Sequence, residues 1–556
     1  MLKFFKTIFS YSISYHWLIL IVSAYIVVCL NHSFHKTFDD VALQVGFSYL
    51  VWVKYIVHIA ILALAFEILS LRLSVKYVVI FVLLLCSVCG FYMESLGVVL
   101  DEDIIQSVFE THTNEALDMV SFGFIVYVLL FGVVPSVLVL LIKIKRFSLK
   151  KALREKLFFV AVLAIMISGS YAATGKDITF VFKTQKTLRD MPNPIAPIRS
   201  FVRYIQHSKE KNFTPMLVAK DAVLSVDSPK QIVLFMIGES ARSANFSLNG
   251  YKKETNPYTK AFNVISFREF YSCGVITAIA VPCMLTHYTR ETYTHRNLSL
   301  YVNNILDIAQ SVGYDVWYLG NNGGKCVGGC DRNIRNTLFY STDSLDGVML
   351  KDIAKIVEKA KQNNRNTFIV IHGYGSHGAS YTSRYPKEFE RFTPVCEQKE
   401  LSKCTTEEIS NAYDNSLLYT DWVLAQMIGM LQKDSTSKDS SPMRSMLWYV
   451  SDHGESLGEL GLYMHGGLGY TLAPKYQKHI PSIMWFSQSW GEIPHLVRQR
   501  VEQDFSQDYV FHTLLHILNV QTHLRFCKDS RILSFAKPIL GGLWGLGVII
   551  DSGFLV

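Results

Sequence analysis

The pattern of apolar residues divides the chain into two parts. Before residue 174 the sequence is dominated by long apolar stretches, each close to the ~20 residues that a helix needs to cross a bilayer. These stretches lie at about 16–32, 49–71, 77–99, 119–142 and 156–173. The sequence therefore predicts a five-helix transmembrane domain over residues 1–173.

From residue 229 onward the pattern changes. Short apolar runs typical of buried strands alternate with helical stretches such as 300–312 and 415–433. The runs lie at 231–238, 314–320, 367–373, 445–451 and 481–487. Such alternation predicts an α/β domain, here residues 229–536, in which helices cover a central, mainly parallel sheet.

Two further segments flank this domain. Residues 174–228 are polar and interrupted by prolines, with an amphipathic segment around Ile198–Tyr204, and we interpret them as a linker along the membrane surface. Residues 537–556 are an apolar, glycine-rich tail to which the sequence assigns no role.

Loop charges predict the orientation in the membrane. Lys3 and Lys6 precede the first apolar stretch, and lysines and arginines crowd residues 143–156, whereas acidic residues mark the alternate loops around 39–40 and 101–118. Basic loops stay in the cytoplasm, so the N-terminus lies inside and everything after about residue 174 lies outside. The net charge of +8 comes partly from the basic loop and does not indicate nucleic-acid binding.

Cysteine spacing agrees with an exported domain. Most of the ten cysteines fall in its sequence as close pairs, which in an oxidising compartment predict local disulfides. The pairs are Cys273/Cys283, Cys326/Cys330 and Cys396/Cys404. A metal site is the alternative for Cys326 and Cys330, and Cys527 has no evident partner.

Residues 100–118 are too polar to span a membrane and predict a short amphipathic helix on its outer face. Ser107, Thr111 and Glu115 follow one another at intervals of four and so share one side of such a helix. Their hydroxyls suit a phosphate and their carboxylate suits an ammonium group. A solvated polar face is the alternative.

Metal-binding residue types follow three of the predicted strands. Glu239 follows the first, Asp452 and His453 follow the strand at 445–451, and His372 ends the strand at 367–373. Further histidines lie at His377 and His465, and Thr277 opens a buried helical run between two cysteines. Ligands collect where parallel strands end, so this set predicts a mixed oxygen and nitrogen site for one divalent cation, Zn²⁺ or Mn²⁺. Alternatively, Thr277 is a helix cap and each histidine an ordinary loop residue.

Four segments carry a family resemblance: GESARSANFSLNGY (238–251), SCGVITAIAVPCM (272–284), HGYGSHG (372–378) and SDHGESLGE (451–459). They resemble the phosphoethanolamine transferases of Gram-negative envelopes, a family that includes lipid A modifiers and mobile colistin-resistance enzymes. The resemblance implies an alkaline-phosphatase/sulfatase-like fold for the exported domain. It also implies a multi-pass inner-membrane protein with a periplasmic catalytic domain.

The resemblance also implies residue roles. Thr277 would be the nucleophile and, with Glu239, Asp452 and His453, a zinc ligand. The substrate or a second metal would contact a further set: His377, His465, His372, Asn322, Lys325, Ser107, Thr111 and Glu115. Two positions depart from the family pattern, because Lys325 precedes Cys326 instead of lying between the paired cysteines, and Ser107 replaces an asparagine.

The implied activity is metal-dependent transfer of phosphoethanolamine from phosphatidylethanolamine to lipid A, a core sugar or another envelope glycan, through a phosphorylated Thr277. We expect a monomer that binds the membrane and no nucleic acid. The alternatives are a phosphoglycerol transferase of the lipoteichoic-acid-synthase type and a membrane-anchored sensor with an inactive enzyme domain. A sulfatase is disfavoured, because no Cys-x-Pro-x-Arg sequence follows Cys273.

Overall fold

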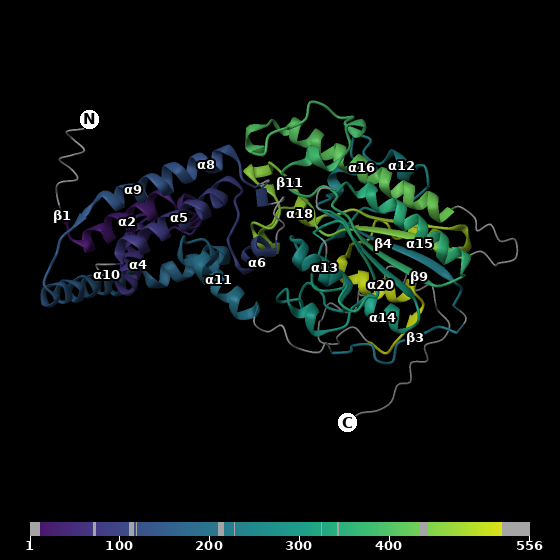
Figure 1. The fold of residues 1–556 in the computed structure, drawn as a ribbon, viewed down its shortest axis with the longest axis horizontal. Coiled ribbons are helices and arrows are strands. Elements are labelled where there is room, and N and C mark those ends of the chain that lie inside the picture. The colour runs from purple at the N-terminus through teal and green to yellow at the C-terminus, as the bar shows by residue number, and fades with distance from the viewer. Residues whose placement is uncertain are drawn as a thin grey trace, which may run out of the picture. The chain divides into compact units, whose positions relative to one another are not determined.

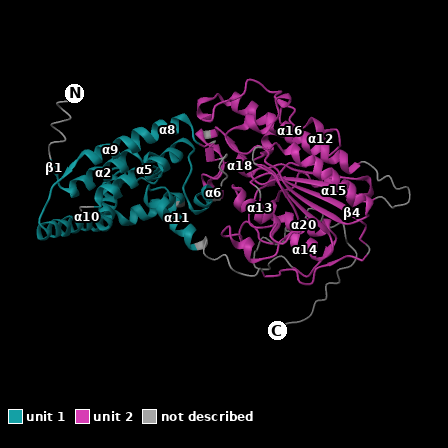
Figure 2. Ribbon diagram, viewed as in Figure 1, with its two compact units in different colours: residues 1–110, 120–209 teal, residues 111–119, 210–556 magenta. Residues whose placement is uncertain are grey.

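The computed structural model describes residues 12–70, 74–110, 116–117, 119–208, 216–226, 228–323, 325–341, 344–432 and 443–524. The chain forms two compact units, shown in different colours in Figure 2. Unit 1 comprises residues 1–110 and 120–209, and unit 2 comprises residues 111–119 and 210–556. Each unit has its own apolar cores.

Unit 1 is helical (Figure 1). Its α-helices are α2 (Tyr15–Cys29), α3 (His32–Gln44), α4 (Leu50–Leu69), α5 (Val75–Ser95), α6 (Glu102–Glu110), α8 (Phe122–Val128), α9 (Val134–Leu141), α10 (Leu149–Thr184) and α11 (Ile195–Ser208). A π-helical turn at Leu129–Val133 joins α8 to α9. Strands β1 (Ser12–Ile13) and β2 (Lys143–Ile144) pair in parallel.

Four helical segments among the described residues are long and apolar enough to span a membrane: α4, α5, the run Phe122–Leu141 and α10. Helices α2 and α3 pass the same test only together, with a bend of 67° between them, and would make a fifth span. The first predicted stretch, 16–32, therefore belongs to a bent pair of helices. At the bend, the side chain of Asn31 donates to the carbonyls of Ile26 and Asn193, at 3.0 and 2.9 Å.

Helix α10 continues past the predicted span to Thr184, so the domain boundary expected at residue 173 falls inside this helix. The amphipathic segment expected around Ile198–Tyr204 lies in α11. An aromatic side chain of α11 packs against α6: the ring of Tyr204 stacks on that of Phe109, with ring centroids 5.3 Å apart. Ser107 lies in α6 and its hydroxyl donates to the Asp103 carbonyl. Thr111 and Glu115 lie outside the described residues.

Unit 2 is built on a seven-stranded sheet in the order β5-β13-β10-β4-β9-β7-β8. Its strands are β4 (Gln231–Gly238), β5 (Ile265–Phe267), β7 (Asp315–Gly320), β8 (Asn336–Phe339), β9 (Thr367–His372), β10 (Arg444–Ser451) and β13 (Ser482–Phe486). The five strands from β10 to β8 are parallel, whereas β13 pairs antiparallel with β10 and β5. This confirms the predicted α/β fold with a mainly parallel sheet.

Helices cover both faces of the sheet (Figure 1). The α-helices of the described part of unit 2 are α12 (Pro257–Lys260), α13 (Thr277–Leu285), α14 (Ile305–Ser311), α15 (Leu350–Gln362), α16 (Thr406–Gln432), α17 (Gly469–Leu472), α18 (Lys475–Lys478), α19 (Ile493–Arg498) and α20 (Val510–Ile517). The sequence of strand β4 is continuously apolar because both of its faces are buried, and its alternate residues belong to two different apolar cores. Val233 and Phe235 join the core of α13, α14 and α20, and Ile232 and Leu234 join that of α15 and α16.

Short strand pairs complete unit 2: β3 (Val223–Leu224) with β15 (Val520–Gln521), β6 (Phe270–Tyr271) with β14 (Phe505–Ser506), and β11 (Ser456–Leu457) with β12 (Tyr463–Met464). Disulfides join the three close cysteine pairs, Cys273–Cys283, Cys326–Cys330 and Cys396–Cys404. The first closes the loop that carries Thr277. Cys527 and the apolar tail lie outside the described residues.

Candidate active site

The site lies at the carboxyl ends of two neighbouring parallel strands. Strand β4 ends at Gly238 and runs into Glu239, while β10 ends at Ser451 and runs into Asp452 and His453. Gly238 and Ser451 are register partners, so the residues that follow them emerge side by side. Helix α13 brings Thr277 to the same place as its first residue.

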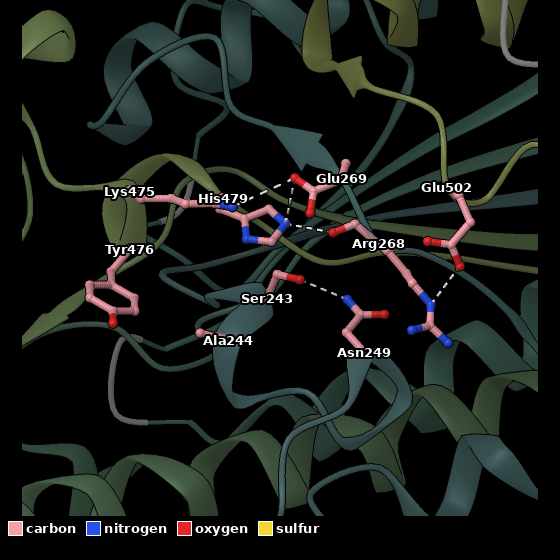
Figure 3. Close-up of a pocket in the computed structure, with 9 residues that line it drawn as sticks. All are labelled: Ser243, Ala244, Asn249, Arg268, Glu269, Lys475, Tyr476, His479 and Glu502. Carbon is pink, nitrogen blue, oxygen red and sulfur yellow. Dashed lines mark hydrogen bonds and ion pairs between the residues drawn. The ribbon is translucent and has the colours of Figure 1, made fainter.

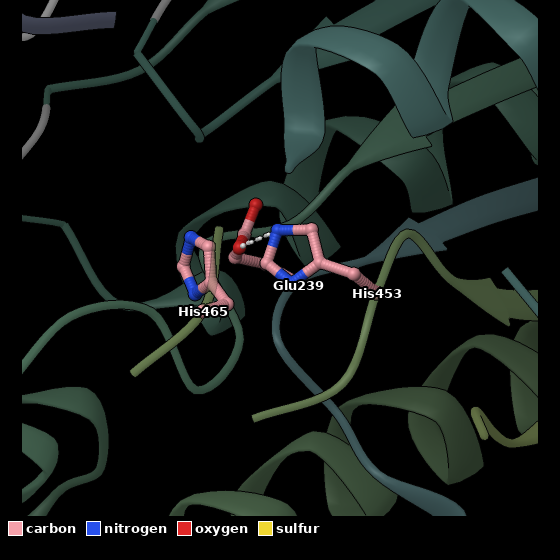
Figure 4. A group of neighbouring side chains, drawn as sticks. All are labelled: Glu239, His453 and His465. Atoms are coloured by element: carbon pink, nitrogen blue, oxygen red, sulfur yellow. Dashed lines mark ion pairs between the residues drawn. The ribbon is translucent and has the colours of Figure 1, made fainter. Parts of the chain in front are cut away.

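The polar atoms of these four residues converge. Thr277 Oγ1 lies 3.2 Å from Glu239 Oε2 and 3.2 Å from His453 Nε2. His453 Nε2 lies 3.4 Å from Glu239 Oε1 and 3.1 Å from Asp452 Oδ2. Figure 4 shows the ion pair between Glu239 and His453, whose side chains are fully buried. A hydroxyl, two carboxylates and an imidazole thus share one small volume.

This arrangement fits a bound cation. Asp452 Oδ2 is buried and accepts no hydrogen bond from the described part of the chain, although it faces His453. A buried carboxylate oxygen without a donor is costly unless a positive charge neutralises it. His453 Nδ1 faces the Gly454 carbonyl at 3.0 Å, which leaves Nε2 free to act as a ligand.

The electrostatics of the site support the same conclusion. Burial opposes ionisation of both Glu239 and His453. The imidazoles of His377 and His453 nevertheless hold the pKa of Glu239 well below its usual range. The carboxylates of Asp452 and Glu239 overcome burial and raise the pKa of His453 to about 9. The buried carboxylates of Asp452 and Glu239 therefore favour a positive charge at this place.

Further polar side chains lie around Glu239, Thr277, Asp452 and His453. His377 Nδ1 lies 3.2 Å from Glu239 Oε1, and the His465 ring centroid lies 3.9 Å from that of His453. The possible ligand atoms of Glu239, His453 and His465 lie within 4.8 Å of one another, close enough to hold one metal ion (Figure 4). His372 lies further away, with Nε2 4.0 Å from Glu239 Oε2.

Asn322 follows β7 and joins the site directly. Its amide nitrogen donates to Glu239 Oε2 at 2.6 Å and lies 3.2 Å from His372 Nε2. Lys325, by contrast, has an exposed side chain. The structure thus brings together Glu239, Thr277, Asn322, His372, His377, Asp452, His453 and His465.

Comparisons with known proteins identify the family of this chain. A family model described as Sulfatase matches residues 231–520, and one described as Phosphoethanolamine transferase EptA/EptB matches residues 58–209. Phosphoethanolamine transferase EptA of Escherichia coli strain K12 is 30% identical over 543 residues, covering 92% of this chain and 95% of that protein. The chain belongs to the phosphoethanolamine transferase family.

Other relatives support this membership. Phosphatidylethanolamine transferase Mcr-1 from Escherichia coli is 32% identical over 527 residues, covering 90% of this chain and 95% of that protein. The integral membrane protein lipooligosaccharide phosphoethanolamine transferase A from Neisseria meningitidis superposes with a TM-score of 0.81 at 26% identity, over 91% of this chain and 96% of that one. The protein is thus a membrane-spanning transferase of phosphoethanolamine, and its fold implies a metal cofactor.

Two residues of this transferase's site were not predicted from the sequence. Ser240 has a left-handed backbone (φ 57°), and its hydroxyl donates to Glu239 Oε1 at 2.7 Å while its N–H donates to Asp452 Oδ1 at 3.1 Å. Glu455 is fully buried and holds His465 Nδ1 at 3.0 Å. Ser240 follows Glu239 directly, and Glu455 comes two positions after His453. Their closeness in sequence to predicted metal ligands could therefore have indicated that they belong to the site.

Proposed function

We propose that this phosphoethanolamine transferase takes its group from phosphatidylethanolamine and passes it to lipid A or a core sugar, with Thr277 as the nucleophile. The observation that carries the proposal is the position of the Thr277 hydroxyl, 3.2 Å from both a carboxylate and an imidazole at the first residue of a buried helix. The donor is named in a relative, phosphatidylethanolamine transferase Mcr-1. Lipid A is named in another, Kdo(2)-lipid A phosphoethanolamine 7''-transferase of Escherichia coli strain K12.

Glu239, Thr277, Asp452 and His453 would hold the metal, and their three oxygens and one nitrogen suit Zn²⁺, with Mn²⁺ as the alternative. When bound, the ion would supply positive charge to the hydroxyl and to the phosphoryl group. His377, His465 and Asn322 would orient that group from the rim of the site, or hold a second ion.

The first chemical step would form a bond from Thr277 Oγ1 to phosphorus and break the bond from phosphorus to the diacylglycerol oxygen. The Thr277 proton passes to a neighbouring base, and the diacylglycerol oxygen takes up a proton, for which His465 and His377 are the nearest candidates. Thr277 is the first residue of α13, so the positive end of the helix dipole would favour the negative phosphoryl group.

In the second step an oxygen of the acceptor would attack the same phosphorus. Its bond to phosphorus forms as the bond to Thr277 Oγ1 breaks, and Thr277 regains its proton. Two successive displacements let a donor lipid and an acceptor glycolipid use one site in turn.

The proposed setting is the bacterial inner membrane, with the N-terminus in the cytoplasm and the catalytic domain in the periplasm. The loop charges and the disulfides of unit 2 support this orientation. The proposed domains are 1–173, 174–228, 229–536 and 537–556, and the proposed working form is a monomer.

The test uses purified full-length protein with phosphatidylethanolamine and lipid A. We expect diacylglycerol and phosphoethanolamine-modified lipid A in equal amounts, and neither from Thr277→Ala. Thr286→Ala is the matched control, because Thr286 lies at the other end of α13, where its hydroxyl donates to the Pro282 carbonyl at 2.8 Å. Wild-type turnover by Thr277→Ala would refute the proposal.

A further inference from the structure

Two cations share one aromatic ring beside the active site. The Arg290 guanidinium carbon lies 4.6 Å from the centroid of the Tyr470 ring, and Lys478 Nζ lies 5.4 Å from the same centroid. Tyr470 belongs to α17 and Lys478 to α18, while Arg290 follows the helix of Thr277. We call these three residues the Tyr470 cluster.

The positive charge of the Tyr470 cluster is not balanced by the described residues. Neither Arg290 nor Lys478 forms an ion pair with any carboxylate that the structure describes, whereas the nearby Lys475 lies 3.7 Å from Glu269. Asp508 accepts a hydrogen bond from the Arg290 backbone N–H at 2.8 Å, and the charge of Arg290 favours the ionised form of this carboxyl. Burial raises the pKa of Asp508, and burial together with the charge of Arg290 lowers the pKa of Lys478.

The Tyr470 cluster is coupled to the reaction centre through the backbone around Lys478. The Lys478 carbonyl accepts a hydrogen bond from Ser272 N, in the loop that leads to Thr277. The carbonyls of Gln477 and Tyr476 accept from Gly454 N and Glu455 N, directly after His453. The backbone that carries Lys478 is therefore fixed to the two loops that carry the nucleophile and the imidazole.

The neighbouring cavity has a different character. It is lined by Ser243, Ala244, Asn249, Arg268, Glu269, Lys475, Tyr476, His479 and Glu502 (Figure 3). Its cations are matched by acids, since Arg268 Nε lies 2.9 Å from Glu502 Oε1 and Lys475 Nζ lies 3.7 Å from Glu269 Oε2. The cavity thus has no excess charge that calls for an anion, and it supplies a control for the Tyr470 cluster.

We infer that Arg290 and Lys478 bind a phosphate group of the acceptor glycolipid and so select phosphorylated acceptors. A guanidinium and an ammonium held on one ring suit the several oxygens of a phosphate monoester, which would relieve the repulsion between the two cations. This inference rests on the proposed function, because it assigns the acceptor side of the same reaction.

The test compares two acceptors that differ by one phosphate, a bisphosphorylated lipid A and its monophosphorylated form, with full-length protein in nanodiscs. The double variant Arg290→Ala with Lys478→Ala should raise KM for the bisphosphorylated acceptor about tenfold or more, since each charged hydrogen bond is worth at least that factor. It should bring the two acceptors close to the same KM. Lys478→Arg should retain the preference, and so should the control Lys475→Ala.

A second readout separates this inference from the proposed function. Diacylglycerol release from phosphatidylethanolamine, without acceptor, reports the donor step alone. If the wild type releases none, the proposed function fails. If it does release diacylglycerol, an unchanged acceptor preference in the double variant overturns the inference. Equal loss of donor and acceptor steps would overturn it too, as would weaker binding to phospholipid vesicles without any change in acceptor KM.

Discussion

Thr277 Oγ1 lies 3.2 Å from Nε2 of His453, although 176 positions separate the two residues in the chain. The contact exists because β10 lies beside β4 in the sheet and α13 begins at the end of both strands. It joins a hydroxyl that can attack phosphorus to the nitrogen that completes the predicted metal site. The proposed role of Thr277 as nucleophile depends on this contact.

Asp452→Asn tests the metal site with little change of shape. The variant keeps Oδ1, which accepts from Ser240 N and His453 N, and removes one buried negative charge. We expect zinc affinity to fall at least about tenfold, since a ligand carboxylate is lost, and transfer to fall with it. Metal analysis by mass spectrometry measures the effect. Glu502→Gln, at an exposed ion pair with Arg268, should keep the wild-type metal content. Full zinc occupancy in Asp452→Asn would exclude this carboxylate as a ligand.

Zinc binding should depend on pH through His453. Burial favours the neutral imidazole of His453, but the charges of Asp452 and Glu239 outweigh burial and raise the pKa of His453 to about 9. Below that pH a proton must leave before Nε2 can bind metal, so affinity falls as pH falls. The expected slope is about tenfold per pH unit between pH 6 and 8. Competition with a chelator of known affinity measures it. A flat profile would mean that His453 binds no metal or carries no proton.

The Cys273–Cys283 disulfide should matter more for activity than Cys396–Cys404. Each closes a short loop, and replacing either pair by serine should cost roughly 2–3 kcal/mol of stability. Only the first closes the loop that carries Thr277, so only its loss should lower kcat strongly. Thermal unfolding and transfer assays on both variants check this, and non-reducing peptide mapping checks the pairing. Equal kcat in the two variants would mean that the Cys273–Cys283 disulfide contributes to stability and not to catalysis.

The predicted outer-face helix should contribute donor binding. Thr111→Ala with Glu115→Ala should cripple transfer from phosphatidylethanolamine in membranes, because the hydroxyl and carboxylate suit its phosphate and ammonium groups. Slow cleavage of a small soluble phosphodiester should persist, since that reaction needs only Glu239, Thr277, Asp452 and His453. Loss of both activities would indicate misfolding, and loss of neither would make this helix a passive spacer.

The sequence predicted the parts of this enzyme that depend on local pattern. Strand β4 is continuously apolar and ends at Gly238, and β10 does the same at Ser451, so the positions of Glu239 and Asp452 at strand ends followed from apolar runs alone. The mainly parallel sheet followed from the alternation of strands and helices. The family resemblance added the roles of the residues.

Other features needed the three-dimensional structure. Nothing in the run 481–487 shows that β13 is antiparallel to β10, because both faces of that strand are buried. The bend between α2 and α3 depends on contacts of Asn31 with a segment 162 positions away. The left-handed backbone of Ser240 could not be predicted from the apolar pattern either. A non-glycine residue keeps a positive φ only where surrounding residues hold its backbone in place.

The most direct test of the central claim is the mass of the Thr277 peptide after wild-type protein is mixed with phosphatidylethanolamine and quenched before acceptor is added. We expect a phosphoethanolamine adduct on Thr277, formed together with one equivalent of diacylglycerol and removed when lipid A is supplied. Diacylglycerol release with an unmodified Thr277, or the adduct on another residue, would contradict it.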